Sequence, residues 1–392
     1  MTYVLKQKQK LAEYYALDMA VKALSQWFWN EYFWLPGNVT WKDLEPSENE
    51  PYPNINHLYV PLGLCIVMIV VRKTLEKLVF IPLSLKFGLK RRRPLGPAPN
   101  PMLETLAKRN GFIEGKDAVG LAKQYDLNER QVERWLRDYR RRTRPSILEK
   151  VAETAWRFVF YTAAFSFGLW NLWNTPWLWD LEEAWKGYPR HYVSDGIWWY
   201  YMFELTFYWS LMLSQFSDVK RKDFWQMFVH HLATVMLLSF SWATNLTRSG
   251  SVVLVIHDCA DIFLEFTKML KYFKKQAACD IFFGVFTIVW ILTRIVIFPV
   301  HVIYSGIFEA PKLYPVFPGY FLFNGLLLLL LSLHIFWTIA IVRMVVVTVQ
   351  AGGMQKDIRS SSEESEEETS SGRSGNTTPI PTPNLDKIEG LQ

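Results

Sequence analysis

The chain has 392 residues, of which half are apolar, 16% are aromatic and 20% are charged, and its formal net charge is +6. With 18 Trp, 18 Tyr and 27 Phe, it is too aromatic for a water-soluble globule and typical of a membrane protein, which places such side chains at the two interfaces. The composition also excludes collagen, a coiled coil and wholesale disorder, so the sequence predicts an integral membrane protein.

The N-terminal region, residues 1–57, contains no apolar core of a cleavable signal peptide before Trp27. Its aromatic stretch, residues 27–35, predicts an interfacial anchor rather than a spanning helix. An Asn-Val-Thr sequon predicts N-glycosylation at Asn38, which places this region in the lumen. A second sequon begins at Asn245, but it lies so near the membrane that we do not expect it to be used.

Seven segments are apolar enough and long enough to cross a bilayer. The first segment is the weakest, because four charged residues interrupt its second half. One spanning helix is therefore expected within residues 58–80, and six more are expected within residues 146–350. The seven segments are residues 58–79, 152–173, 197–216, 224–243, 251–270, 277–304 and 319–349.

The orientation follows from three basic clusters, at residues 72–93, 218–223 and 271–275. They come after the first, third and fifth segments, and basic residues mark cytosolic loops. All three clusters lie in the cytosol only if the N-terminus is luminal and the C-terminus cytosolic. The expected fold class is therefore all-α, a polytopic membrane protein with about seven transmembrane helices.

Most of the excess positive charge lies between the first two spans, where residues 86–144 hold 16 basic and 7 acidic residues, a net charge of +9. Residues 121–142 look like the second and third helices of a homeodomain. The homeodomain asparagine that reads adenine corresponds to Asp138, whose charge would repel DNA. We therefore expect a small cytosolic homeobox-like helical domain at 86–145 that supports folding or contacts anionic lipid or acyl-CoA, and no DNA binding.

The C-terminal tail, residues 351–392, is rich in Ser, Glu, Thr and Pro, and its last 40 residues carry a net charge of −4. We expect this acidic cytosolic tail to be disordered. Ser360, Ser361 and Ser365 each have Glu at the third position after them. That context is favoured by casein-kinase-2-like enzymes and predicts phosphorylation of all three.

Ionisable residues inside two consecutive spans mark a candidate site. His230 and His231 lie in the fourth span, and Asp258 and Asp261 lie in the fifth, three residues apart and so on one helix face. At about 1.5 Å per residue, His230 lies roughly 10 Å and Asp261 roughly 13 Å from the cytosolic ends of their spans. The histidine pair and the aspartates are therefore expected to meet in the cytosolic half of the bilayer.

A His–Asp pair at this depth suits acyl transfer, because the carboxylate fixes the imidazole tautomer while the imidazole acts as base or nucleophile. The alternative is that these polar residues only hydrogen-bond helices together. A metal site is not expected: the chain has seven His, too few for the histidine boxes of membrane hydroxylases. Three of these, His57, His191 and His301, lie near or beyond luminal span ends. The three cysteines form no disulfide framework and no zinc spacing.

Two basic features accompany this candidate site. Arg294, in the sixth span, could clamp an anionic group, but a structural pairing with Glu265 or Glu204 is the expected role. Lys220, Arg221 and Lys222, at the cytosolic mouth of the third and fourth spans, could hold the phosphates of acyl-CoA. Positive-inside topology alone also explains this basic loop.

The run of residues 216–224, continued through His230-His231 to 257–261 and 265–269, resembles the longevity-assurance motif of ceramide synthases, in the TLC-domain superfamily. The resemblance implies a TLC-type helical bundle, with a catalytic domain at residues 146–350. It also implies an endoplasmic-reticulum enzyme that N-acylates a sphingoid base with a fatty acyl-CoA, giving (dihydro)ceramide and CoA, as a sphingosine N-acyltransferase. Acyl-CoA is then a co-substrate, and no tightly bound cofactor is expected.

The resemblance further implies that His230, His231, Asp258 and Asp261 are the catalytic residues. We expect an acyl-imidazole intermediate on His230, oriented by Asp261 or Asp258, although direct general-base transfer stays open. The family's acyl-length preference is associated with the luminal segment 304–315, which could also be an ordinary turn. Family members associate as homo- or hetero-dimers, and membrane lipid is the remaining partner.

Three other functions compete with this assignment. A non-catalytic TLC protein that senses or transfers lipid would not need both His and both Asp. A seven-span receptor is disfavoured by the basic insert after the first span and by the buried acids and histidines. A membrane-tethered transcription factor is disfavoured by Asp138.

Overall fold

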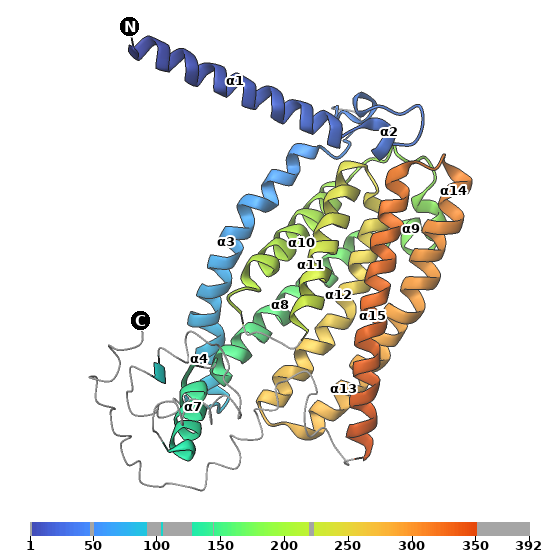
Figure 1. Ribbon diagram of the computed structural model, residues 1–392. Helices are drawn as coiled ribbons and strands as arrows, with labels where there is room; N and C mark the ends of the chain where they lie inside the picture. Colours follow the sequence, from blue (N-terminus) through green and yellow to red (C-terminus); the bar gives the residue numbers. More distant parts are fainter. Residues whose placement is uncertain are drawn as a thin grey trace. The chain divides into compact units, whose positions relative to one another are not determined.

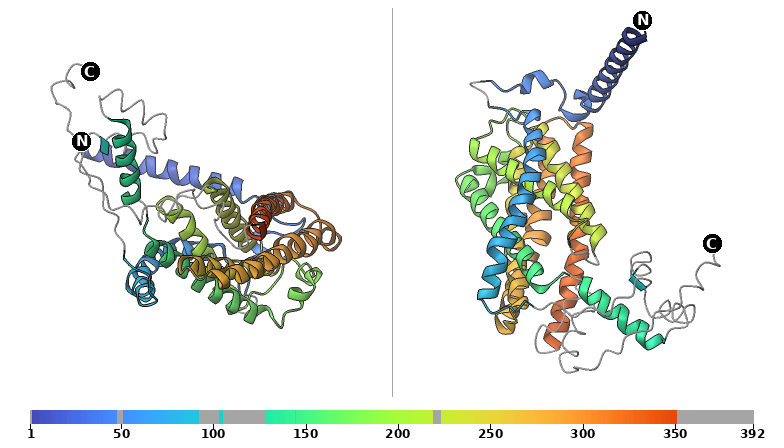
Figure 2. Two further views of the ribbon diagram at one scale, coloured as in Figure 1. Left: turned by 90° about the horizontal axis from the view of Figure 1, so that it is seen from below. Right: turned by 90° about the vertical axis from the view of Figure 1, so that its left-hand side faces the viewer.

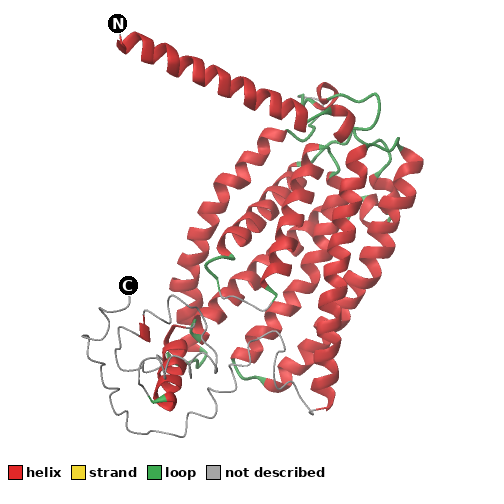
Figure 3. Cartoon of the chain, viewed as in Figure 1, coloured by secondary structure: helices red, strands yellow, loops and turns green. Residues whose placement is uncertain are grey.

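The computed structural model describes residues 2–47, 51–91, 103–104, 128–143, 145–218 and 223–350. All regular secondary structure within these ranges is helical, as the all-α expectation requires (Figure 3). The chain divides into two compact units. The first comprises Met1–Val79 and Glu153–Ser360, and the second comprises Phe80–Ala152 and Ser361–Gln392.

Six long helices follow the predicted second to seventh segments. Helix α11 has the predicted bounds, and the others differ from them at one end or both. Within the first unit, α10 packs against α3 and α11, and α12 packs against α10, α11 and α13 (Figure 1). The helices are α8 (Ile147–Leu172), α10 (Asp195–Ser214), α11 (Phe224–Ala243), α12 (Thr247–Tyr272), α13 (Gln276–Trp290) and α15 (Pro318–Gln350).

Three helical runs in the described part of the chain are long and apolar enough to cross a membrane: Ile55–Lys86, Gln276–Leu313 and Pro318–Gln350. The first includes α3 (Tyr59–Leu75) and α4 (Ile81–Lys86), joined by a π-helical turn, η3 (Glu76–Phe80). The second and third run side by side in the first unit, as two views agree (Figures 1 and 2). These runs make the chain a membrane protein.

The segment between the last two predicted spans is helical rather than an open turn. Helix α13 continues as π-helical η5 (Ile291–Ile303) and η6 (Ser305–Glu309) and then as α14 (Ala310–Leu313), so that residues 314–317 alone connect it to α15. Pro299 lies inside η5 and lacks an amide hydrogen, and the N–H of Tyr304 bonds to the Pro299 carbonyl, five residues back. Such wide turns accommodate a proline without ending the helix.

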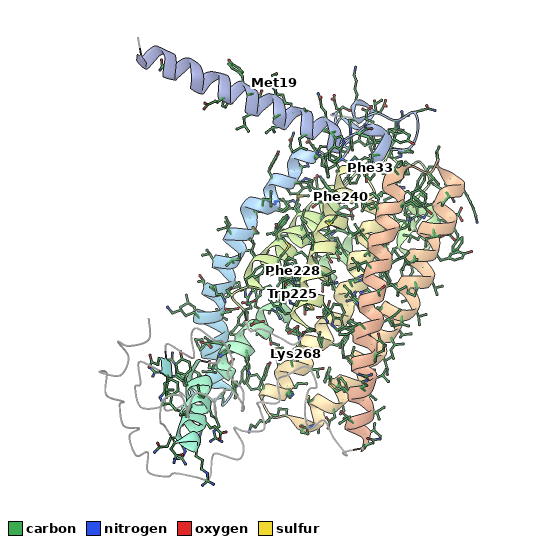
Figure 4. All side chains as sticks on the ribbon, viewed as in Figure 1. Met19, Phe33, Trp225, Phe228, Phe240 and Lys268 are labelled. Atoms are coloured by element: carbon green, nitrogen blue, oxygen red, sulfur yellow. The ribbon has the colours of Figure 1, made fainter. Side chains whose placement is uncertain are left out.

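The N-terminal aromatic stretch packs into the core of the first unit. It is preceded by helix α1 (Thr2–Phe28), which is not predicted from the sequence. Trp34, at the end of α2 (Glu31–Trp34), is 2% exposed, and its ring centroid lies 4.7 Å from that of Phe240. Figure 4 labels Phe240, which belongs to α11. The aromatic side chains here therefore fix this segment against the helices, whereas the sequence predicts only contact with the membrane interface.

The charges that weaken the first predicted span are paired. Arg72 is buried at 2% exposure, and its guanidinium bonds to Glu76 at 2.7 Å and to Asp218 at 3.0 Å and 3.1 Å. Arg157 on α8 bonds to Glu153 at 2.6 Å and lies 3.7 Å from Asp218. Because buried charges are tolerated when they are paired, this network holds α3 to α8 and to the end of α10.

The two sequons differ in exposure. Asn38 is exposed and adopts a positive φ of 73°. Asn245 is 1% exposed, and its side-chain amide donates to the carbonyls of Pro189 and His191, each at 2.7 Å. The Asn245 amide is therefore buried and bonded within the fold, whereas Asn38 is exposed.

In the second unit, α7 (Glu129–Thr143) covers the residues predicted to resemble the third homeodomain helix. Val132, Trp135 and Leu136 are buried, and their spacing places them on one face of the helix. Asp138 lies within α7, whereas the predicted second helix, with Leu121 and Tyr125, lies outside the described residues.

Candidate active site

The two neighbouring histidines of α11 have different surroundings, because adjacent helix residues point roughly 100° apart. His231 is buried, and its Nδ1 donates to Oε1 of Gln215 at 2.9 Å. The Gln215 amide is oriented in turn by its bond to the Phe224 carbonyl at 2.8 Å. His230 is half-buried with its ring against that of Trp337 on α15, at a centroid distance of 5.6 Å. The Nδ1 atom of His230 is buried and has no hydrogen-bond partner among the described residues.

The two aspartates of α12 bond to groups other than His230. Asp258 is fully buried and accepts a hydrogen bond from Oη of Tyr200 at 3.2 Å. Asp261 accepts one from Nη2 of Arg294 at 3.1 Å. The direct contact predicted between His230 and an aspartate is therefore absent from the described residues, although all three side chains belong to one bundle.

Arg294 lies on η5 and bonds to two residues of α12. Its guanidinium is 3% exposed, and Nη2 donates both to Asp261 and, at 2.6 Å, to the carbonyl of His257. Arg294 pairs with Asp261 rather than with the expected Glu265 or Glu204. Glu265 bonds instead to Lys268 at 2.6 Å, and neither carboxylate oxygen of Glu204 has a hydrogen-bond partner among the described residues. The Nε and Nη1 atoms of Arg294 are buried without a partner among the described residues. They are donors available to a developing negative charge.

Two further buried histidines, which were not among the predicted site residues, lie beside this group. The rings of His257 on α12 and His334 on α15 lie 5.0 Å apart, and both contact Phe298 on η5. His334 is 1% exposed, and neither of its ring nitrogens has a partner among the described residues. Both histidines could have been selected from the sequence, because any ionisable residue within an apolar span marks a candidate site.

A cavity lies next to these residues, and its empty volume of about 860 Å³ includes space that is open to solvent. Its lining residues include Thr234, His257, Tyr314, Phe317 and Tyr320. Its wall is mostly aliphatic and aromatic, as suits an alkyl chain. Thr234 lies one turn after His230 and donates to the His230 carbonyl at 2.9 Å, so one wall residue of the cavity lies a single helical turn from that histidine.

The remaining predicted site residues lie away from this cluster or outside the described part of the chain. Asn38 is exposed at the N-terminal side of the first unit. The basic loop and the three tail serines fall outside the described residues: Lys220, Arg221, Lys222, Ser360, Ser361 and Ser365.

Comparison with known proteins identifies the family. Residues 150–343 match the model of the TLC domain. The chain is 40% identical to human ceramide synthase 5 over 344 residues, which is 87% of this chain and 88% of that protein. It is 39% identical to human ceramide synthase 4 over 347 residues, 88% of each chain. It is 34% identical to ceramide synthase hyl-1 of Caenorhabditis elegans over 351 residues, 86% of this chain and 84% of that one. With its buried His and Asp residues beside an apolar cavity, the chain belongs to the ceramide synthase family of TLC-domain proteins.

Proposed function

We propose that this protein is a sphingosine N-acyltransferase, which transfers a fatty acyl group from acyl-CoA to the amino group of a sphingoid base. The products are (dihydro)ceramide and CoA. The observation that carries the proposal is the position of His230, a half-buried histidine one turn from an apolar cavity. The similarity to ceramide synthases over most of the chain supports the same reaction.

In the proposed mechanism, the His230 imidazole attacks the thioester carbonyl carbon. A carbon–nitrogen bond forms, the carbon–sulfur bond breaks, and CoA leaves as the thiol with the proton that the imidazole ring gives up. The unpartnered Nε and Nη1 donors of Arg294 stabilise the negative charge that develops on the carbonyl oxygen, while Asp261 holds the guanidinium in place. The alkyl tail lies in the cavity, which shields the acyl-imidazole from water.

The other two catalytic candidates support this arrangement in the proposal. His231 and its bond to Gln215 fix the end of α10 against α11. Asp258 and its bond to Tyr200 fix α12 against α10. Both contacts keep His230 next to the cavity, because they hold α10, α11 and α12 in fixed positions relative to one another.

The test uses purified full-length protein in detergent, acyl-CoAs of graded chain length and sphinganine, with products identified by mass spectrometry. The wild type is compared with His230→Ala and with His301→Ala, a control histidine on η5. We expect N-acyl sphinganine from the wild type and the control but not from His230→Ala, and an acyl adduct on the wild type before amine is added. Product without an adduct would favour direct general-base transfer. No product from folded wild type would favour a lipid-sensing or lipid-transfer protein instead.

We also propose a topology for this enzyme. Seven transmembrane helices cross the endoplasmic-reticulum membrane, one within residues 58–80 and six within the catalytic domain at 146–350. The luminal region, residues 1–57, carries a glycan at Asn38. The cytosolic parts are the homeobox-like domain at 86–145 and the acidic tail at 351–392. The basic clusters that follow the first, third and fifth spans support this orientation.

Further roles in the proposal belong to the cytosolic and luminal loops and to assembly. Lys220, Arg221 and Lys222 hold the phosphates of acyl-CoA, and the homeobox-like domain contacts lipid or acyl-CoA rather than DNA. Kinases modify the tail serines Ser360, Ser361 and Ser365. Residues 304–315 influence acyl-chain length, and the enzyme forms homo- or hetero-dimers.

A further inference from the structure

The ring of His257 is held in one tautomer by the backbone of its own helix. Its Nδ1 lies 2.6 Å from the carbonyl oxygen of Val253. A carbonyl oxygen only accepts hydrogen bonds, so Nδ1 must carry the proton. In the neutral ring Nε2 is then a basic lone pair, and this atom is buried without a hydrogen-bond partner among the described residues.

The neighbours of His257 leave that lone pair unoccupied. The ring packs edge-on against Phe298 and lies beside His334, with both centroid distances at 5.0 Å. The charged and titratable groups that face it are His334 from α15, His230 from α11 and Arg294 from η5. Arg294 bonds to the backbone carbonyl of His257 and not to its ring. An unpartnered buried acceptor with a fixed tautomer is an unusual arrangement that a substrate proton would satisfy.

His257 also lines the cavity that is proposed to hold the acyl chain. Thr234, which is bonded to the backbone of His230, lines it too. An acyl group attached to His230 would extend into this cavity. Both that acyl group and an amine that approaches it would therefore be close to His257. This placement is independent of the contacts of Asp258 and Asp261, which bond to Tyr200 and Arg294.

The second half of the reaction needs a base, and this inference rests on the proposed function. An alkyl amine such as Lys has a pKa of about 10.4 and is an ammonium ion at neutral pH. The amine nitrogen bonds to the acyl carbon, the bond from that carbon to the His230 imidazole breaks, and the ammonium loses two protons in becoming an amide. One proton stays with His230, which leaves as neutral imidazole. The other must be removed by a base.

We propose that Nε2 of His257 is the general base that removes one proton from the sphingoid ammonium before the amine attacks, and that this proton then passes to water. His230 and His257 thus divide the reaction, with His230 carrying the acyl group and His257 activating the acceptor. General-base catalysis contributes about 10²–10⁴-fold to a rate.

The test compares wild type, His257→Asn and the control His301→Gln as full-length proteins in detergent. An Asn amide can still donate to the Val253 carbonyl but offers no basic nitrogen. Acyl-adduct formation from acyl-CoA alone is measured first, and turnover with sphinganine is then measured across pH. We expect adduct formation in His257→Asn at the wild-type rate, with turnover reduced by about 10²–10⁴-fold. Turnover of the variant should rise about tenfold per pH unit as free amine accumulates, whereas the wild type should change little above neutrality.

Equal losses of adduct formation and turnover in His257→Asn would overturn the proposal, because they would indicate a structural role. An unchanged turnover or an unchanged pH profile would overturn it as well. Failure of the proposed function is distinguishable, since the wild type itself would then give no product. If wild type gives product without an adduct, the pH profiles alone decide whether His257 is the base. If His257→Asn has no melting transition, His257→Gln takes its place in every arm.

Discussion

Replacement of Asp261 by Asn should destabilise the protein by leaving the Arg294 cation buried without its counter-ion. The two charged atoms lie 3.1 Å apart, which corresponds to an attraction of about 5 kcal/mol at an effective dielectric constant near 20. The Asp261 side chain is 20% exposed and that of Arg294 is 4% exposed, so water screens part of this attraction. Removing one partner of a buried pair costs about 3–5 kcal/mol, and we expect a loss near 3 kcal/mol in the free energy of unfolding.

The assay is equilibrium unfolding in mixed detergent micelles, followed by circular dichroism. Glu45→Gln, which changes an exposed acid, is the control and should have little effect. The double variant Asp261→Asn/Arg294→Met removes both charges and should recover part of the loss, with an interaction energy of up to about 3 kcal/mol. A loss below about 1 kcal/mol in the single variant, as at a surface ion pair, would refute the reasoning.

Two further predictions concern packing and pH. A Cβ at Gly250 would overlap the hydroxyl of Tyr201, which bonds to Ser241, whereas a Cβ at Gly284 meets nothing within 4 Å. Gly250→Ala should therefore lower the unfolding free energy by about 1–3 kcal/mol, and Gly284→Ala should not; equal effects would contradict this. Burial lowers the pKa of His191, in a loop outside the spans, from 6.5 to about 4, although its bond to the Lys186 carbonyl opposes the shift. The neutral ring is favoured in the fold, so stability is complete above pH 6.5 and falls by up to about 1.4 kcal/mol per pH unit as the pH drops toward 4. Thermal midpoints across this range should vary less in His191→Gln, and an identical pH dependence would count against His191.

Much of the helical architecture was predictable from contiguous sequence. The bounds of α11, Phe224–Ala243, agree with the segment expected from apolarity alone, because helix length and lipid contact depend on consecutive residues. The position of the site was predictable for the same reason, since a buried His or Asp in an apolar segment is conspicuous in the sequence. Helix α1 was not predictable in this way, because its apolar residues follow no strong helical period and form no spanning run.

The tertiary structure decided which buried groups bind one another. Depth along a helix placed His230 and Asp261 at similar levels, but rotation about each helix axis directs Asp261 to Arg294, which lies on a helix 33 residues further along the chain. Rotation also brings His257 and His334 together from α12 and α15. The structure alone shows that residues 304–313 are helical, because π-helical turns continue the helix past Pro299. The sequence could not show this, because the cost of the amide donor that Pro299 lacks depends on the turns around it. The sequence by itself determined the positions of most of the long apolar helices, the charged residues within them and the family. Their mutual rotation, and hence the partners of each buried charge, required the folded chain, because such contacts join residues far apart in sequence.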